Sequence, residues 1–129
     1  MTTVDKHVIL QNTSLASTPL IPELKVHLAT NAATLWEMTE AEMQNINLPL
    51  PFWSFAWVGG QALAHYILHN PNLVKKTVLD IGTGSGIVGL STLLSLTSKV
   101  DFKEVGPFAT ESIRLNLKVN NLSHNFQIL

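Results

Sequence analysis

The sequence predicts an α/β fold built around a parallel, doubly wound sheet. From Gln61 onward, short apolar runs alternate with segments of helical periodicity. A glycine-rich turn separates one apolar run from the helix that follows it. Hydrophobic residues make up 46% of the 129 residues and charged residues only 13%. This composition provides enough apolar surface for a core and argues against a disordered chain.

The first part of the chain is expected to be less regular. Residues 1–20 are polar, with scattered Ser and Thr, and predict a flexible lead-in. Pro22–Thr30 alternates apolar and polar side chains, which is typical of a half-exposed strand. A short helix is expected over Ala32–Met38, and a capping-box pattern at Thr39 predicts another. The prolines and asparagines of Asn45–Pro51 should end that second helix.

The second part predicts helix, strand, helix, strand, helix, strand, the order of a doubly wound sheet. These elements are expected over Gln61–Asn70, Thr77–Ile81, Ile87–Leu96, Lys99–Val105, Pro107–Asn121 and Phe126–Leu129. The apolar run Thr77–Ile81 is typical of a buried parallel strand. We therefore divide the chain into a lead-in over 1–20, a strand and helix cap over 21–58, and a sheet domain over 59–129.

Composition and spacing exclude several kinds of function. A net charge of −1 gives no basic surface for nucleic acid. The absence of cysteine excludes disulfides and thiolate zinc sites, and fits a cytoplasmic protein. We expect no secretion signal, and Ile87–Leu96 is too short to cross a membrane. His65 and His69 are four residues apart but lack a third ligand nearby, so we expect a helix surface and no metal site.

The main functional signal is the turn that follows Val78–Ile81. Three glycines, Gly82, Gly84 and Gly86, alternate with other residues behind the acid Asp80. Glycine lets the backbone approach a ligand closely, and the N-terminus of the next helix attracts negative charge. Such sites also need an acid about 20 residues on that binds ribose hydroxyls. Glu104, 18 positions after Gly86 at the end of the next predicted strand, meets this need.

Three interpretations of the turn remain open. It could be a tight strand–helix connection with no ligand. It could bind a dinucleotide, although that fingerprint is spaced G-x-G-x-x-G and Asp80 would repel a pyrophosphate. The observed G-x-G-x-G spacing behind an acid instead resembles the first motif of class I methyltransferases, which bind S-adenosylmethionine.

An aromatic segment, Phe52–Leu63, narrows this resemblance. Together with Ile21–Leu24, Leu35-Trp36, the glycine turn and Pro107–Ala109, it resembles the lysine methyltransferases of the electron transfer flavoprotein β subunit. These enzymes are related to ribosomal protein L11 methyltransferase. The resemblance runs from about Ile21 to the C-terminus. It implies a Rossmann-like class I methyltransferase fold that stops after about the third strand of the parallel sheet.

The resemblance also implies site residues. Asp80, Gly82, Thr83, Gly84 and Gly86 would line the methionine end of the cofactor. Trp57 would pack near the cofactor, and Glu104 would bind the ribose. For the neighbouring aromatic residues Phe52, Trp53 and Phe55 we expect packing in the core or in a lid. No catalytic residue is assigned.

Two departures and the length of the chain leave the activity open. Gly106 replaces the second acid of the family's Asp-x-Asp-Pro pattern, which removes a negative charge from the ribose end. Val58 replaces a common proline.

The chain is expected to be a fragment of a protein-lysine methyltransferase, with a flavoprotein or ribosomal protein as substrate. The alternatives are a catalytically inactive cofactor-binding remnant and, third, a nucleotide-linked oxidoreductase. Half a parallel sheet would leave an exposed edge and an uncovered face, so we expect a marginal or oligomeric chain.

Overall fold

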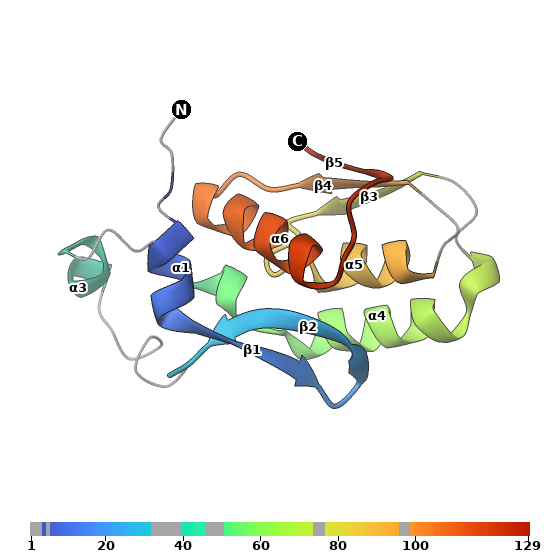
Figure 1. The fold of residues 1–129 in the computed structure, drawn as a ribbon, viewed down its shortest axis with the longest axis horizontal. Helices are drawn as coiled ribbons and strands as arrows, with labels where there is room; N and C mark the ends of the chain where they lie inside the picture. The colour runs from blue at the N-terminus through green and yellow to red at the C-terminus, as the bar shows by residue number, and fades with distance from the viewer. Residues whose placement is uncertain (1–3, 5, 32–39, 46–50, 74–76, 96–98) are drawn as a thin grey trace.

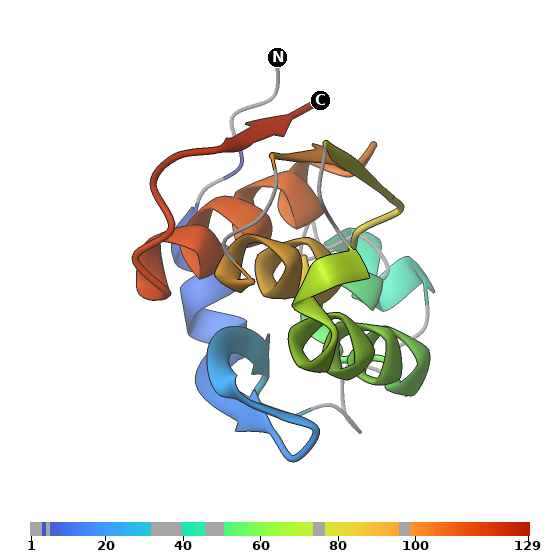
Figure 2. The ribbon, with the colours of Figure 1, turned by 90° about the vertical axis from the view of Figure 1, so that its right-hand side faces the viewer.

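The described part of the chain folds into three layers (Figure 1). A computed structural model describes residues 4, 6–31, 40–45, 51–73, 77–95 and 99–129. A parallel sheet forms one outer layer, two helices form the middle layer, and a β-hairpin with one further helix forms the other outer layer. The same layering is seen from the side in Figure 2.

The sheet consists of β3 (Val78–Ile81), β4 (Val100–Lys103) and β5 (Phe126–Ile128), all parallel and in the order β3-β4-β5. The middle-layer helices α5 (Ile87–Leu94) and α6 (Pro107–Val119) connect successive strands. Each of these elements lies within the range that the sequence predicts. The predicted α/β fold with a parallel sheet is therefore confirmed. The prediction succeeds in this half of the chain because the buried residues there have a strong periodicity.

The two faces of the sheet differ in burial. Val100 and Phe102 point toward the helices and are fully buried. On the opposite face, Leu79 is 53% exposed and Ile81 73% exposed, and none of the described elements covers them. The expectation of a strand buried on both faces is therefore wrong for β3, whose residues alternate between half-buried and exposed.

The N-terminal hairpin corrects a second expectation. Residues 6–18 are not a loose lead-in: they form α1 (Lys6–Asn12) and β1 (Thr13–Thr18). Strand β1 pairs antiparallel with β2 (Ile21–Ala29), so the hairpin crosses the expected boundary between residues 20 and 21. The predicted strand over Pro22–Thr30 is confirmed, with Leu24 and Val26 buried. The polar sequence of β1 gives little alternation from which a strand could be recognised.

Helix α4 lies beside the hairpin and packs on α5. It spans Val58–His69 and begins three residues earlier than predicted, so the expected boundary at residues 58 and 59 falls inside its first turn.

The other described elements are α3 (Glu40–Asn45) and the single-turn 3-10 helices η1 (Phe52–Ser54) and η2 (Pro71–Leu73). The predicted helix over 32–38 lies outside the described residues. Within the described residues, no helix has both the length and the apolar character to cross a membrane.

A glycine of α5 sets the distance between that helix and the sheet. A Cβ atom added to Gly89 would lie 2.2 Å from Cε1 of Phe102 and less than 3 Å from two further ring atoms. Phe102 is fully buried, so its ring has no free space into which it could move. The helix and β4 therefore approach as closely as a residue without a side chain allows.

This contact makes Gly89→Ala a destabilising substitution. We expect a loss of about 1–3 kcal/mol in the free energy of unfolding, because overpacking outweighs the better helix propensity of alanine. Gly59→Ala in α4 is the matched control, since a Cβ there would meet nothing within 4 Å. The control should gain up to about 1 kcal/mol. Urea denaturation of both variants tests this, and equal stabilities would contradict the packing argument.

Candidate cofactor-binding site

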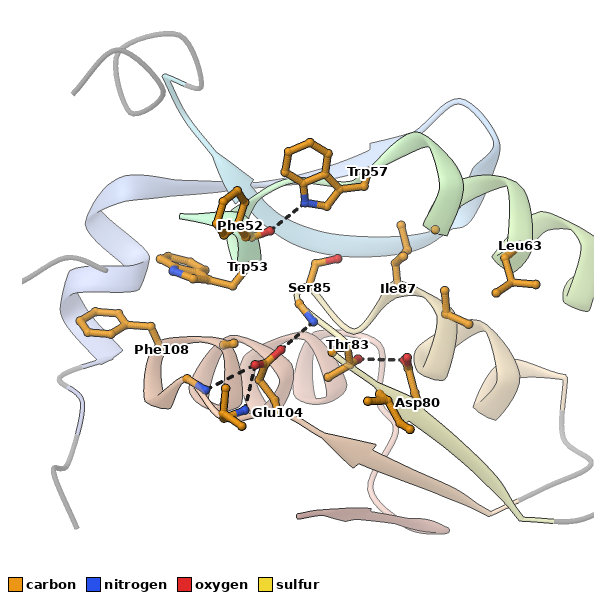
Figure 3. A pocket seen from close by; sticks show the side chains of 18 residues that line it. Phe52, Trp53, Trp57, Leu63, Asp80, Thr83, Ser85, Ile87, Glu104 and Phe108 are labelled. Carbon is orange, nitrogen blue, oxygen red and sulfur yellow. Dashed lines mark hydrogen bonds between the residues drawn. The ribbon is translucent and has the colours of Figure 1, made fainter. Parts of the chain in front are cut away.

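A cavity of about 500 Å³ opens at the carboxyl ends of β3 and β4 (Figure 3). This volume lies in the usual range for small-molecule sites. Six of the seven site residues predicted from the sequence line it: Trp57, Asp80, Gly82, Thr83, Gly84 and Glu104. The parallel sheet brings these residues together because its strand ends meet at one edge, where ligands of such folds bind.

The seventh predicted residue, Gly86, lies behind the turn rather than in the cavity wall. It is buried and precedes the first residue of α5 with a φ of 82°. A Cβ atom there would lie 3.4 Å from a side-chain carbon of Ile113. Gly82 and Gly84 also have positive φ values, of 65° and 57°. The left-handed conformation of all three residues explains why this turn requires glycine.

Asp80 joins the strand, the turn and the helix through one carboxylate oxygen. Its Oδ2 accepts a hydrogen bond from Oγ1 of Thr83 at 2.8 Å and from the N–H of Gly89 at 2.9 Å. The Gly89 N–H belongs to the first turn of α5, where N–H groups lack partners within the helix. The carboxylate therefore caps α5 from the strand, and it accepts no other hydrogen bond within the described residues.

Burial raises the pKa of the Asp80 carboxyl above its usual value of 3.8, because desolvation disfavours the charged form. The two hydrogen bonds to Thr83 and Gly89 lower the pKa and partly offset this effect, whereas the negative charge of Glu104 raises it further. The cavity thus contains a carboxylate whose negative charge is poorly compensated by the protein. A ligand with a positive group would relieve that cost.

Glu104 lies on the same side of the sheet as the glycine turn. Its Oε2 accepts from the N–H of Gly84 at 3.1 Å, and its Oε1 accepts from the N–H groups of Val105 at 2.9 Å and Gly106 at 3.4 Å (Figure 3). A carboxylate has about four lone-pair sites, so these three bonds leave acceptor capacity toward the cavity. The bond to Gly84 fixes the carboxylate against the turn.

The aromatic segment forms another wall of the cavity. Trp57 is 48% exposed, donates from its ring N–H to the carbonyl of Phe52 at 3.1 Å, and packs against the rings of Phe52 and Phe55. Trp53 is buried and stacks on Phe108, with ring centroids 6.1 Å apart. Packing is thus observed for all three neighbouring aromatics, and Phe52 and Trp53 also line the cavity.

Sequence reasoning missed other lining residues. Ser85 and Ile87 flank Gly86, and Phe108 follows the proline that begins α6. The available signal was that Ser85 and Ile87 adjoin predicted site residues and that Phe108 belongs to the Pro107–Ala109 segment of the resemblance. Their side chains, however, carry no distinctive chemistry. His65 and His69 lie on the exposed face of α4 with ring centroids 4.1 Å apart. Among the described residues no three His, Cys, Asp or Glu side chains are grouped to hold a metal ion.

Comparison with known proteins identifies the family of the chain. The profile of the ribosomal protein L11 methyltransferase (PrmA) family matches residues 61–129. The chain belongs to this family. It is 35% identical to the electron transfer flavoprotein β subunit lysine methyltransferase of Xenopus laevis over 93% of the chain and 48% of that protein. It is 34% identical to a Caenorhabditis elegans homologue of that enzyme over 88% of the chain and 46% of the homologue.

The L11 methyltransferase relationship also reaches bacterial members. The L11 methyltransferase of Bacillus licheniformis is 34% identical over 53% of the chain and 20% of that protein. The chain spans about half the length of the flavoprotein methyltransferases that it matches. The resemblance seen in the sequence motifs is therefore confirmed at the level of the family, whose profile begins within α4 and covers the whole sheet.

The raised pKa of Asp80 predicts a pH dependence of stability. Because the folded state holds this proton more tightly than the unfolded state, stability should fall as pH rises from 3.8 through the raised folded pKa. Asp80→Asn cannot titrate and should lack this component. The free energy of unfolding of the wild type, minus that of Asp80→Asn, should therefore decrease over this interval in urea denaturation. Glu111→Gln, outside the cavity, is the control; a difference that increases with pH would contradict the assignment.

Gly106 offers a second test, at the end of the cavity where Glu104 lies. It is the N-cap residue of α6, with extended backbone and no side-chain cap. A Cβ there would meet only Ala109, at 3.8 Å. Gly106→Asp should cap the helix and favour its dipole, raising stability by a few tenths to about 1 kcal/mol. Thermal unfolding measures this; a lower melting temperature would show that repulsion from Glu104 outweighs the cap.

Proposed function

We propose that this chain forms the cofactor-binding part of an S-adenosylmethionine-dependent methyltransferase that acts on lysine side chains of a protein. One observation carries the proposal: the carboxylates of Asp80 and Glu104 reach the same cavity from adjacent strand ends, with the glycine turn between them. The names of the related proteins support lysine as the acceptor.

The amino-acid end of the cofactor matches Asp80. S-adenosylmethionine carries an ammonium group, and the Oδ1 atom of Asp80 can accept a hydrogen bond from it while Oδ2 remains bound to Thr83 and Gly89. This pairing would relieve the cost of the buried charge that raises the pKa of Asp80. A pyrophosphate would add negative charge at the same place, which argues against a dinucleotide.

The nucleoside end matches Glu104 and the aromatic wall. The carboxylate of Glu104 keeps about one acceptor site beside its three hydrogen bonds, which suits a ribose hydroxyl. Trp57 and Phe52 provide an apolar wall that would exclude water from a bound ligand. In this arrangement Gly82, Thr83 and Gly84 form the floor, and Gly86 acts indirectly by shaping the turn.

When bound, the cofactor would supply a methyl group already activated by a sulfonium. The protein must then hold it in line with an uncharged lysine amine and keep water out. Burial of the lysine would lower its pKa and favour the neutral form. A flavoprotein β subunit or a ribosomal protein is the proposed type of substrate, by analogy with the related proteins. A cytoplasmic location, which the cysteine-free sequence favours, is part of the same proposal.

A second candidate is a cofactor-binding protein without transfer activity. Gly106 favours this second candidate. A glycine stands where the family has a second acid at the ribose end, so less negative charge is available there. The two candidates share the cavity and differ only in the reaction. Transfer of a labelled methyl group to the flavoprotein β subunit or L11 distinguishes them.

Isothermal titration with two ligands tests the orientation of the cofactor. S-adenosylhomocysteine contains both the amino-acid and nucleoside ends, whereas methylthioadenosine lacks the amino acid. Asp80→Asn should weaken only the first, about tenfold or more, because it removes the partner of the ammonium group. Glu104→Gln should weaken both ligands by a similar factor.

Asp101→Asn is the control, because Asp101 lies on β4 outside the cavity wall and pairs with Lys99. Its binding of both ligands should match the wild type. Equal losses for both ligands in Asp80→Asn would contradict the pairing of Asp80 with the amino-acid end. Preferential binding of NAD by the wild type would refute the proposed cofactor.

A further inference from the structure

Along one edge of the N-terminal hairpin, the backbone of β2 bonds to the side chains of Asn116 in α6 and of Asn120, the C-cap residue of that helix. The N–H of Lys25 donates to Oδ1 of Asn120 at 3.0 Å, and Nδ2 of Asn120 donates back to the carbonyl of Lys25 at 2.6 Å. The N–H of His27 donates to Oδ1 of Asn116 at 2.8 Å. Lys25 and His27 are two residues apart in β2, so both present their backbone groups to this edge.

Asn116 also reaches the glycine turn. Its side chain is fully buried, and its Nδ2 donates to the carbonyl of Ser85 at 2.9 Å. The side-chain amide of Asn116 therefore connects the hairpin with the turn. Its partner His27 in the hairpin is 89 residues away in the sequence, and its partner Ser85 in the turn is 31 residues away. Asn120, one helical turn further along, makes no hydrogen bond to the turn among the described residues.

The hydrogen bond from Asn116 to the carbonyl of Ser85 holds one end of the peptide unit between Ser85 and Gly86. The carbonyl of Ser85 and the N–H of Gly86 belong to the same planar peptide unit. That N–H donates to the carbonyl of Thr83 at 2.9 Å, so the plane is held at both ends. Its neighbours Gly84 and Gly86 both have positive φ, which leaves the turn dependent on such contacts for a single conformation.

We propose that Asn116 is a positioning residue for the cofactor-binding turn, through which docking of the hairpin on α6 sets the conformation of residues 84–86. Its side chain does not line the cavity, so it acts through the Ser85 peptide. Without it, the buried Ser85 carbonyl and the His27 N–H would both lose their partner, which disfavours the present arrangement. The effect on ligand affinity rests on the proposed function, but the effect on the turn does not.

Amide hydrogen exchange in the ligand-free chain tests the positioning directly. Asn116→Ala should accelerate exchange of the Gly86 N–H about tenfold or more relative to the amides of β4, together with that of the His27 N–H. Asn120→Ala is the matched control, because it removes a hairpin contact of similar type one turn away. It should accelerate exchange at Lys25 and leave Gly86 unchanged. Equal acceleration at Gly86 in both variants, or none in Asn116→Ala, would overturn the proposal.

Asn116→Asp provides a readout that a merely structural role would not change. A protonated carboxyl can still donate to Ser85 and accept from His27, whereas an ionised one cannot donate. Binding of S-adenosylhomocysteine, expressed relative to the wild type at each pH, should therefore be weakened about tenfold at high pH and recover as pH falls. The ionisable groups nearby, His27, Asp80 and Glu104, are the same in both proteins, so the ratio to the wild type isolates the effect of the introduced carboxyl. A ratio independent of pH would contradict the role of the donated bond.

The outcomes separate this inference from the proposed function. If the wild type fails to bind S-adenosylhomocysteine, the proposed cofactor is wrong, yet the exchange rates still decide whether Asn116 positions the turn. If the wild type binds and Asn116→Ala binds equally well with an unchanged Gly86 exchange rate, the inference is wrong and the proposed function stands. If Asn116→Ala does not fold, the isosteric Asn116→Asp, compared with the wild type above and below the pKa of the introduced carboxyl, decides the question.

Discussion

The carboxylate of Asp80 links the sheet, the glycine turn and α5, and the rest of the site depends on this link. Its Oδ2 holds the hydroxyl of Thr83 in the turn and the N–H of Gly89 in the helix. Gly89 in turn packs against the buried ring of Phe102 in the neighbouring strand. Polar and apolar contacts therefore fix the same turn of α5 from two directions, and a shift of the helix would break both.

The burial of Asp80 and its position near Glu104 destabilise the charged form of its carboxyl, and a ligand can offset this destabilisation. A carboxylate that is partly desolvated and close to Glu104 is less stable in its charged form, and its pKa is raised accordingly. Two donors compensate only part of this cost. Functional sites often contain such incompletely compensated charges, because a ligand can supply what the protein lacks. The structure of the turn thus favours a cationic ligand group more than a second anion.

The sequence was sufficient for the sheet half of the fold and for most of the cavity. Residues from Gln61 onward combine strong periodicity with a glycine spacing that has few physical explanations. The strands therefore lie in the predicted ranges, and six of the seven predicted site residues line one cavity. The sequence did not predict strand β1. Its Thr13–Thr18 segment is polar and short, and its strand conformation depends on pairing with β2. The sequence also could not show that Gly86 lies behind the turn, since the contact with Ile113 comes from a helix that is distant in sequence.

The asparagines of α6 illustrate why the remaining contacts escape prediction. A polar residue in a helix usually faces solvent, and Asn116 and Asn120 would be assigned there from spacing alone. Asn116 is instead fully buried, because both ends of its amide find backbone partners in segments far apart in the chain. A buried amide tolerates little displacement of either partner, since it would lose hydrogen bonds that water cannot replace. The N-terminal hairpin is therefore part of the support of the turn, although it contributes no residue to the cavity wall.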